Sequence, residues 1–158
     1  MYTLYFSPGS CSLVVHCLLE ELGVPFELKR VDANAKDDYR KLNPKGKVPA
    51  IAGPDGVLTE CVAIVEYLCD RHDAQRRWLA APGTWQRAKT LEQIATLATE
   101  IHPVFNRYFF MVMARWGRWL DPPANEMRNI RPFYERMIAR PAVARAFATE
   151  GIKTFGTT

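Results

Sequence analysis

A cysteine lies inside a short segment of small and turn-forming residues, Ser7–Ser12 (Ser-Pro-Gly-Ser-Cys-Ser), between a predicted strand and a predicted helix. The first turn of a helix presents unpaired backbone N–H groups and the positive end of the helix dipole. Both features favour a thiolate, and they can also hold an anionic or sulfur-bearing ligand. Cysteines are more often small apolar core residues, but this position makes Cys11 the first candidate for a reactive atom.

The segments on either side of this cysteine predict a strand, a loop and a helix. Residues 2–6 are rich in aromatic and β-favouring types, and Pro8-Gly9 then forms a turn. Ser10 or Ser12 can cap the helix that follows, and Gly23, with a proline two residues later, predicts its end. The helix is indicated by apolar residues at helical spacing, namely Leu13, Val14, Cys17, Leu18 and Leu22.

Polar and turn-forming residues at 73–84 divide the chain into a mixed part and a helical part. We therefore expect one domain over residues 1–77 and a second over residues 84–158, an α/β domain followed by an all-α domain. In the first, Phe26–Val31 alternates like a strand, and Pro54-Asp55-Gly56 forms the turn of a predicted hairpin. The next helix would use the face Val62, Val65, Leu68 and Cys69, and later helices are predicted over residues 85–101, 108–120, 126–139 and 142–150.

The composition is that of an ordinary soluble protein, with 158 residues, 48% hydrophobic and 24% charged. No apolar run approaches a membrane span, and the start of the chain lacks the pattern of a signal peptide, so we expect a cytoplasmic protein. The four cysteines have no paired metal-ligand spacing, which predicts reduced thiols and no metal. Because residue 14 is Val14, Cys11 belongs to no C-x-x-C motif, and the spacing argues against the dithiol cycle of thioredoxin.

The net charge of +4 is concentrated in the second half of the chain. A basic half can indicate a nucleic-acid surface. Its arginines, however, are spread over several predicted helices and form no block, which favours a solvated basic face and no nucleic-acid partner.

Three motifs in order resemble those of bacterial glutathione S-transferases, most closely the beta class. They are Tyr5–Ser12, Asn43–Pro49, and Leu58-Thr59-Glu60 leading into Ile64–Leu68, and Ala139–Val143 with Glu150-Gly151 resembles the closing helices of that family. The resemblance implies a thioredoxin-like domain followed by a helical domain, with a cis peptide bond at Val48-Pro49. It also implies detoxification chemistry with glutathione as co-substrate, a small hydrophobic electrophile and no cofactor.

The same resemblance implies which residues bind glutathione. Next to Pro49, the backbone N–H and C=O of Val48 would pair with the cysteinyl backbone of the ligand, much as a neighbouring strand would. Glu60 would pair with its amino group, while the Cys61 N–H at a helix start would receive its γ-glutamyl carboxylate. The family more often has Ser or Gly at the position of Cys61. Two lysines match or neighbour family positions and are otherwise solvated charges, Lys36 at the glycyl end and Lys47 where glutamine is usual.

The catalytic assignment is also carried by the resemblance. The Cys11 N–H, Ser12 and His102 would hydrogen-bond the glutathione sulfur and favour its thiolate, and Trp116 would line the electrophile pocket. His102 and Trp116 can equally be ordinary packed or exposed residues. The beta-class cysteine can form a mixed disulfide with glutathione, so Cys11 would also suit thiol–disulfide exchange.

Between Phe105 and Tyr108 the chain departs from the family, which has a further long helix there. A shortened helical domain would uncover the apolar face of Ile94, Leu97, Ile101 and Phe105, and exposed apolar area of this kind favours a homodimer. Three interpretations remain open: a working transferase with a more open electrophile site, a catalytically weak glutathione-binding or interaction protein, and a thiol transferase that acts mainly through Cys11.

Overall fold

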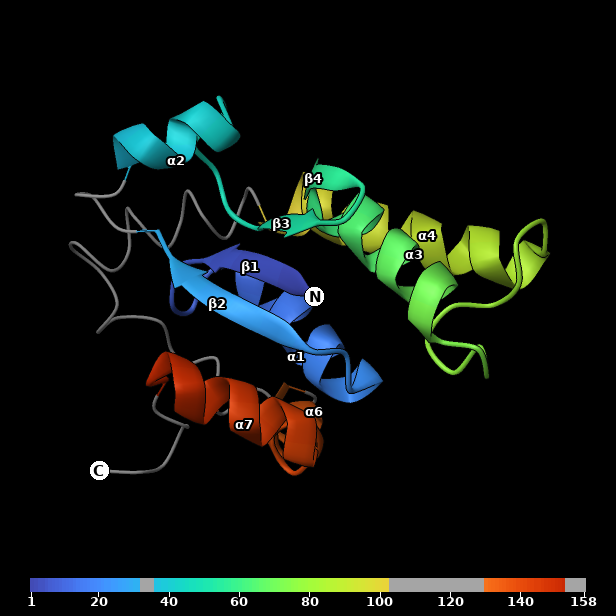
Figure 1. The fold of residues 1–158 in the computed structure, drawn as a ribbon. Helices are drawn as coiled ribbons and strands as arrows, with labels where there is room; N and C mark the ends of the chain where they lie inside the picture. The colour runs from blue at the N-terminus through green and yellow to red at the C-terminus, as the bar shows by residue number, and fades with distance from the viewer. Residues whose placement is uncertain (32–35, 103–129, 153–158) are drawn as a thin grey trace.

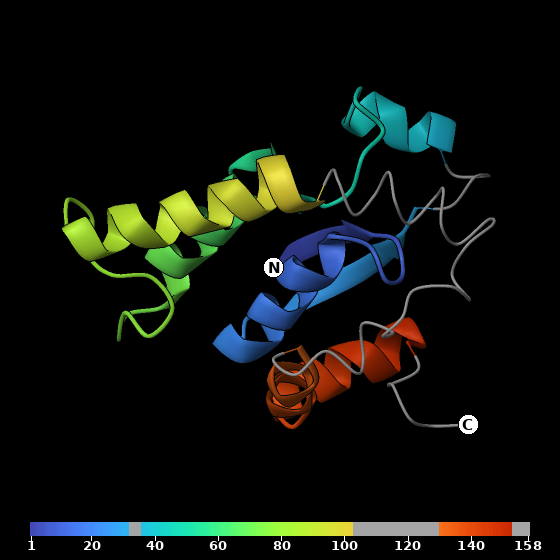
Figure 2. The same cartoon turned by 180° about the vertical axis from the view of Figure 1, so that it is seen from behind.

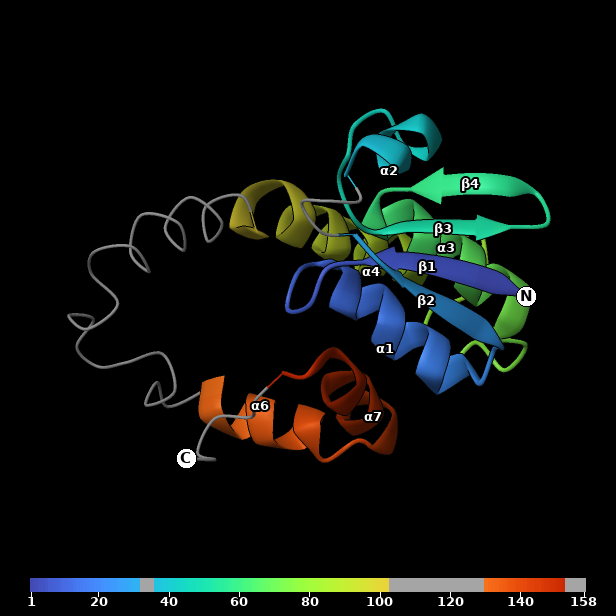
Figure 3. The same ribbon diagram turned by 60° about the vertical axis from the view of Figure 1, so that its left-hand side comes forward.

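A four-stranded sheet organises the first part of the molecule in the computed structural model, which describes residues 1–31, 36–102 and 130–152. Its strands are β1 (Tyr2–Phe6), β2 (Phe26–Arg30), β3 (Ala50–Gly53) and β4 (Gly56–Thr59). They lie in the order β2-β1-β3-β4, side by side in Figures 1 and 3. β1 and β2 are parallel, whereas β3 is antiparallel to both of its neighbours. The predicted first strand, second strand and hairpin are therefore confirmed.

The helices pack around this sheet and continue beyond it. They are α1 (Ser12–Leu22), α2 (Lys36–Leu42), α3 (Cys61–His72), α4 (Trp85–Thr96) with the π-helical turn η1 (Leu97–Ile101), α6 (Ile130–Ile138) and α7 (Pro141–Glu150). Seen from behind, α4 runs along α3 (Figure 2). The helices expected over 85–101 and 142–150 are confirmed, and α6 occupies the described part of the one expected over 126–139. The helix expected over 108–120 lies outside the described residues.

The core lies between one face of the sheet and the helices α1 and α3. Alternate residues of β1 are buried, and Leu4 packs with Leu19 of α1 and with Ile64 and Leu68 of α3. Burying each of these side chains contributes about 1.5–3 kcal/mol. Tyr5 points to the opposite face of β1 and contacts Tyr39 of α2, with ring centroids 5.4 Å apart. The sheet thus holds α1 and α2 on opposite sides of the strand that leads to the loop before α1.

Helix α7 returns to the first part of the chain and packs against α1 (Figure 1). Two ion pairs border the contact, from Arg140 to Glu21 and from Arg145 to Glu20, each 2.6 Å long. The C-terminal helix therefore lies against α1, the helix that follows the loop Ser7–Cys11. As predicted, α1 ends at Gly23, whose φ of 64° is the left-handed conformation that glycine adopts most readily.

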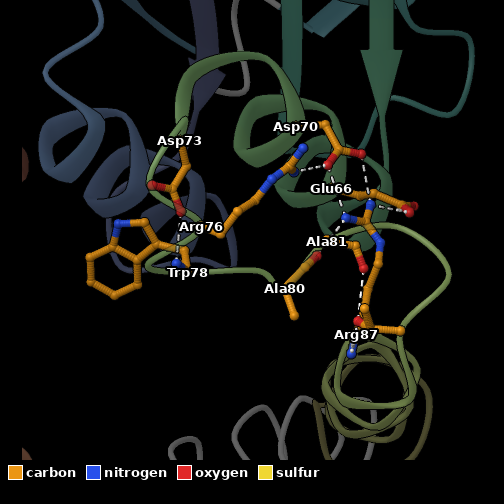
Figure 4. A network of polar contacts seen from close by, with 9 residues as sticks. Glu66, Asp70, Asp73, Arg76, Trp78, Ala80, Ala81 and Arg87 are labelled. Carbon is orange, nitrogen blue, oxygen red and sulfur yellow. Dashed lines mark hydrogen bonds and ion pairs between the residues drawn. The ribbon is translucent and has the colours of Figure 1, made fainter.

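A buried arginine joins α4 to α3 (Figure 4). Arg87 forms ion pairs of 2.7 Å with both Glu66 and Asp70 of α3, and it also donates to the carbonyl of Ala80 at 3.1 Å. Arg76 donates to the same Asp70 carboxylate at 2.6 Å. Fixing one guanidinium by several oxygens orients α4 relative to the sheet domain.

Candidate functional site

Cys11 stands directly before the first turn of α1. It occupies the N-cap position, is half-buried, and its thiol donates a hydrogen bond to the carbonyl oxygen of Val48 at 3.2 Å. The Val48-Pro49 peptide bond is cis, as the resemblance implied. The loop before α1 and the segment before β3 therefore meet at the cysteine sulfur, and the predicted strand–loop–helix placement of this thiol is confirmed.

The serines around Cys11 serve the loop. The expectation that Ser12 caps the helix is wrong, because Ser12 is its first residue and Cys11 holds the N-cap position. Ser10 does receive a hydrogen bond from the backbone N–H of Ser12 at 3.2 Å. The Ser12 hydroxyl donates to the carbonyl of Ser7 and accepts from the Ser7 N–H and the Ser10 hydroxyl. Ser12 is 0% exposed, and these hydrogen bonds use its hydroxyl to hold the loop.

The surroundings of Cys11 lower the pKa of its thiol from 9.0 to about 7. The largest cause is a hydrogen bond from the Cys61 thiol, supported by the backbone N–H of Cys11 itself and by the positive charge of Lys47. Burial and the negative charge of Glu60 act in the opposite direction. The balance leaves about half of the Cys11 thiols ionised near neutral pH.

Cys61 comes from the start of α3 and reaches the same place. Its thiol donates to the carbonyl oxygen of Cys11 across 3.6 Å, and when Cys11 is ionised the same proton can turn to the Cys11 sulfur, which lowers the pKa of Cys11. Donation to a thiolate is the stronger of the two interactions because the acceptor is charged. It raises the pKa of Cys61 well above its ordinary range, since loss of the Cys61 proton would remove the bond and bring two negative charges together. Sequence reasoning assigned only the backbone of Cys61 to the site.

The pKa values of the remaining two cysteines, Cys17 and Cys69, are shifted in the opposite direction to that of Cys11. Burial is the main cause that raises the pKa of both Cys17 and Cys69 to about 11. Cys69 is buried and Cys17 is half-buried, in agreement with the helix-core role expected for them. Cys11 is thus the one cysteine of the four whose pKa is lowered.

The segment that carries Val48 is held from α2. Tyr39 donates to the carbonyl of Lys47 at 2.6 Å, and the side-chain amide of Asn43 donates to the same carbonyl at 2.8 Å and to the Tyr39 hydroxyl at 3.2 Å. Tyr39 and Asn43 are both buried. These contacts fix the backbone one residue before Val48, and sequence reasoning missed them, although Asn43 is the first residue of the Asn43–Pro49 motif and Tyr39 lies four residues before it.

Glu60 precedes α3 with an exposed carboxylate. Lys45 pairs with it at 2.9 Å, across two exposed side chains. The backbone of Glu60 has φ 72°, a value that non-glycine residues rarely adopt and that is concentrated at functional sites. Lys47 is exposed beside the cysteine, and Lys36 is the first residue of α2. Glu60, Cys61, Lys47 and Val48 therefore gather around Cys11, while nothing is described of the Lys36 side chain.

A buried carboxylate from the last helix holds the same loop. Glu150 accepts a hydrogen bond from the backbone N–H of Gly9 at 3.1 Å, and Nδ1 of His16 donates to its other oxygen at 2.8 Å. Both side chains are buried. Gly9 has φ 68°, which a residue with a side chain adopts only with strain. In the sequence, the signal for this contact is a glutamate at the end of an apolar helix face, within the closing motif.

The described part of the structure does not connect His102 or Trp116, the two site residues expected from the helical domain, with Cys11. His102 follows η1 and is exposed, and within the described parts of the chain no hydrogen bond joins it to the loop residues around Cys11. Trp116, with Phe105 and Tyr108, lies outside the described residues.

Among the residues that the structure describes, no group of three or more acidic, histidine or cysteine side chains could hold a metal ion. No helix in the same part of the chain has the length and apolar character to cross a membrane.

Comparisons with known proteins agree with this geometry. Residues 1–70 match the family model of the glutathione S-transferase N-terminal domain. Glutathione S-transferase GstA of Escherichia coli O157:H7 is 32% identical over 201 residues, which cover 95% of this chain and 99% of that protein. Because this chain has only 158 residues, the relative carries segments that have no counterpart here.

Solved structures give the same picture. A sphingomonad glutathione S-transferase complexed with glutathione is 26% identical with a TM-score of 0.77, covering 96% of this chain and 100% of that one. A beta-class enzyme from Sphingomonas chungbukensis is 25% identical with a TM-score of 0.78, over the same shares of the two chains. The expected thioredoxin-like sheet domain followed by helices is therefore confirmed.

Proposed function

Because this chain belongs to the glutathione S-transferase family, we propose that it joins the thiolate of glutathione to small hydrophobic electrophiles, with thiol–disulfide exchange at Cys11 as a second reaction of the same site. The observation that carries the proposal is the position of Cys11. This thiol lies at the start of α1, beside the Val48 carbonyl, and its pKa is lowered to about 7 by the Cys61 hydrogen bond. The helix start and the hydrogen-bond donors that favour a sulfur anion at Cys11 would act in the same way on a glutathione sulfur bound beside a protonated Cys11 thiol.

The gathered polar groups suit the two ends of glutathione. The Val48 backbone would pair with the cysteinyl backbone of the ligand, and the first N–H groups of α3, including that of Cys61, would bind the γ-glutamyl carboxylate. Glu60 would bind the adjoining amino group. Its present partner is Lys45, but an ion pair between exposed side chains contributes only about 0–1 kcal/mol. A ligand ammonium can therefore replace it. Lys36 and Lys47 are assigned to the glycyl carboxylate.

In the conjugation step, the electron pair of the glutathione sulfur forms a bond to an electrophilic carbon, and the leaving group departs with its bonding pair. The protein favours the thiolate by donating hydrogen bonds to it. The Cys11 N–H at the helix start is the donor that the loop geometry supports, and His102 would be a second donor from the helical side. Ser12 acts by holding the loop. Trp116 is assigned to a wall of the electrophile pocket.

Two observations favour a second candidate, a glutathione-binding protein with weak catalysis. The alignment to GstA is longer than this chain, which supports a shortened helical domain. In addition, Leu97 and Ile101 of η1 are 54% and 43% exposed. Helices from the second domain would form much of the electrophile pocket, so their loss would leave glutathione binding intact and impair conjugation. The same exposed face is the basis for the proposed homodimer.

The cellular location is proposed from the cysteines. Four free cysteines support a cytoplasmic location.

Conjugation of glutathione to a generic aryl halide tests the proposal. The rate with protein is compared with the uncatalysed rate and with the rate of Cys11→Ala at the same pH. A protein-dependent rate that falls in the variant supports a transferase that uses Cys11. No rate from folded, glutathione-saturated protein would select the binding protein instead.

A further inference from the structure

The two cysteines at the site come from separate helix starts, 50 residues apart in sequence. Cys11 precedes α1 and Cys61 begins α3, and the two helices pack against each other behind the thiols. The Cys61 Sγ lies 3.6 Å from the Cys11 carbonyl oxygen and within hydrogen-bonding reach of the Cys11 sulfur. The chain has no C-x-x-C motif at Cys11, which argued against a pair of neighbouring thiols. The packing of α1 against α3 nevertheless brings two thiols together.

Both sulfurs are accessible enough to react. Cys11 and Cys61 are each half-buried, and both are free thiols. Cys61 is the first residue of a 12-residue helix, where unpaired N–H groups favour a thiolate. Burial and Glu60 also raise the pKa of Cys61, but the largest cause is the hydrogen bond to Cys11, and the charge of the Cys11 thiolate adds to it. Both contributions from Cys11 disappear once the Cys11 sulfur is bonded to another sulfur and carries no charge.

We propose that Cys61 is the resolving partner of Cys11, so that the two thiols cycle between a dithiol and an internal disulfide in reactions with glutathione disulfides. The inference rests on the exchange activity of Cys11 proposed above and is independent of conjugation. It gives the side chain of Cys61 a role that a backbone contact to glutathione does not require.

The reaction balances in two steps. The Cys11 thiolate attacks one sulfur of oxidised glutathione, forms a mixed disulfide and expels a glutathione thiolate. Cys61 then loses its proton to the expelled thiolate or to solvent, attacks the Cys11 sulfur and expels the second glutathione. Two protein thiols are oxidised to one disulfide, while one glutathione disulfide is reduced to two thiols. Two further molecules of glutathione return the protein to the dithiol by the reverse steps.

The other cysteines do not compete for this role. Cys69 is buried in the core cluster, and Cys17 lies within α1 with its pKa raised to about 11. A thiol of that kind is almost fully protonated at neutral pH and attacks disulfides slowly. Cys17 therefore serves as a matched control.

The test uses the reduced full-length chain mixed with a small excess of oxidised glutathione, in the absence of oxygen. Free glutathione released per protein is measured, and the protein is mapped by mass spectrometry without reduction. Wild type is expected to release two equivalents and to contain a Cys11–Cys61 disulfide. Cys61→Ser keeps a hydrogen-bond donor beside Cys11 but has no sulfur, so it should release one equivalent and retain glutathione on Cys11. Cys17→Ser should behave as wild type.

The disulfide map of wild type does not depend on how well any variant folds. If wild type releases one equivalent and retains the glutathione adduct, as Cys61→Ser does, the resolving role of Cys61 is overturned. If wild type releases none, the inference fails together with the exchange activity of Cys11. Aryl halide conjugation by the same reduced sample reports separately on the transferase proposal.

Discussion

The carboxylate of Glu150 accepts a hydrogen bond from the backbone N–H of Gly9, 141 residues earlier in the chain, at 3.1 Å. It simultaneously accepts from His16 of α1, and the side chains of Glu150 and His16 are both buried. The last helix is therefore part of the support of the loop that carries Cys11. Its contribution can be measured as both stability and reactivity.

Glu150→Ala should destabilise the protein by about 3 kcal/mol, because it leaves the buried partners of the carboxylate unpaired. Urea unfolding measures the loss, and the rate of Cys11 alkylation shows whether the loop has moved. Arg145→Ala removes a more exposed ion pair from the same helix contact and should cost less than about 1 kcal/mol. Equal losses in the two variants would contradict a special role for Glu150.

The reactivity of Cys11 should follow its thiolate, with a half-maximal alkylation rate near pH 7. A lowered pKa means that the reactive form is present at lower pH than for an ordinary thiol. Cys61→Ala removes the main stabilising donor and should shift the midpoint upward by about one unit or more, whereas Cys61→Ser retains a donor and should shift it less. The measurement is iodoacetamide alkylation of Cys11 followed by mass spectrometry between pH 5 and 10. An identical midpoint in all three proteins would exclude the thiol hydrogen bond as the cause.

Arg87→Leu should lower the free energy of unfolding by about 1–3 kcal/mol, since Glu66 and Asp70 lose their shared partner while remaining partly exposed. The Arg87 hydrogen bonds also hold the pKa of Asp70 below its usual range. A carboxyl with a lowered folded pKa stabilises the fold above its unfolded pKa and loses that contribution as pH falls through the folded value. The difference between wild type and variant should therefore shrink in acid.

Urea unfolding at pH 7 and again near pH 3 checks both statements. Lys41→Ala is the control, because its ion pair with Asp38 is exposed on both sides and should contribute less than about 0.5 kcal/mol. A constant difference at the two pH values would contradict the ion-pair explanation.

His102→Ala tests whether the helical domain supplies a donor to the reacting sulfur. We expect the affinity for glutathione to stay within about twofold and the conjugation rate to fall about tenfold or more. Thr99→Ala, in the same π-helical turn, is the control. A rate unchanged across pH would remove His102 from the mechanism.

The exposed side chains of Leu97 and Ile101 lead us to expect a homodimer at micromolar concentration. Replacing both with glutamate should raise the dissociation constant at least about tenfold. Val14→Glu, which changes an exposed apolar residue on α1, should leave it unchanged. Sedimentation measures all three proteins, and a stable wild-type monomer would contradict the expectation.

Local patterns predicted much of this fold, because each element uses residues that suit it independently of distant contacts. The strand before Cys11, the helix end at Gly23 and the hairpin around Asp55 are examples. The contact of Cys61 with Cys11 could not be read from spacing, since it depends on how α1 and α3 pack. The hydrogen bonds of the buried Ser12 hydroxyl and the hydrogen bond from Gly9 to Glu150 were missed for the same reason. The partner of a polar side chain is determined by the tertiary fold and not by its neighbours in sequence.

The two hydrogen bonds that Tyr39 and Asn43 donate to the Lys47 carbonyl bear on the rate at which a ligand would leave the site. Tyr39 belongs to α2, a helix of only seven residues, and Asn43 follows it directly; helices this short owe their stability to tertiary contacts. When α2 unfolds locally, the backbone beside Val48 loses its anchor, and a bound tripeptide loses its strand-like partner. If glutathione binds at Val48 as proposed, we expect the residence time of the product to follow the opening rate of this short helix, which hydrogen exchange at its amides would report.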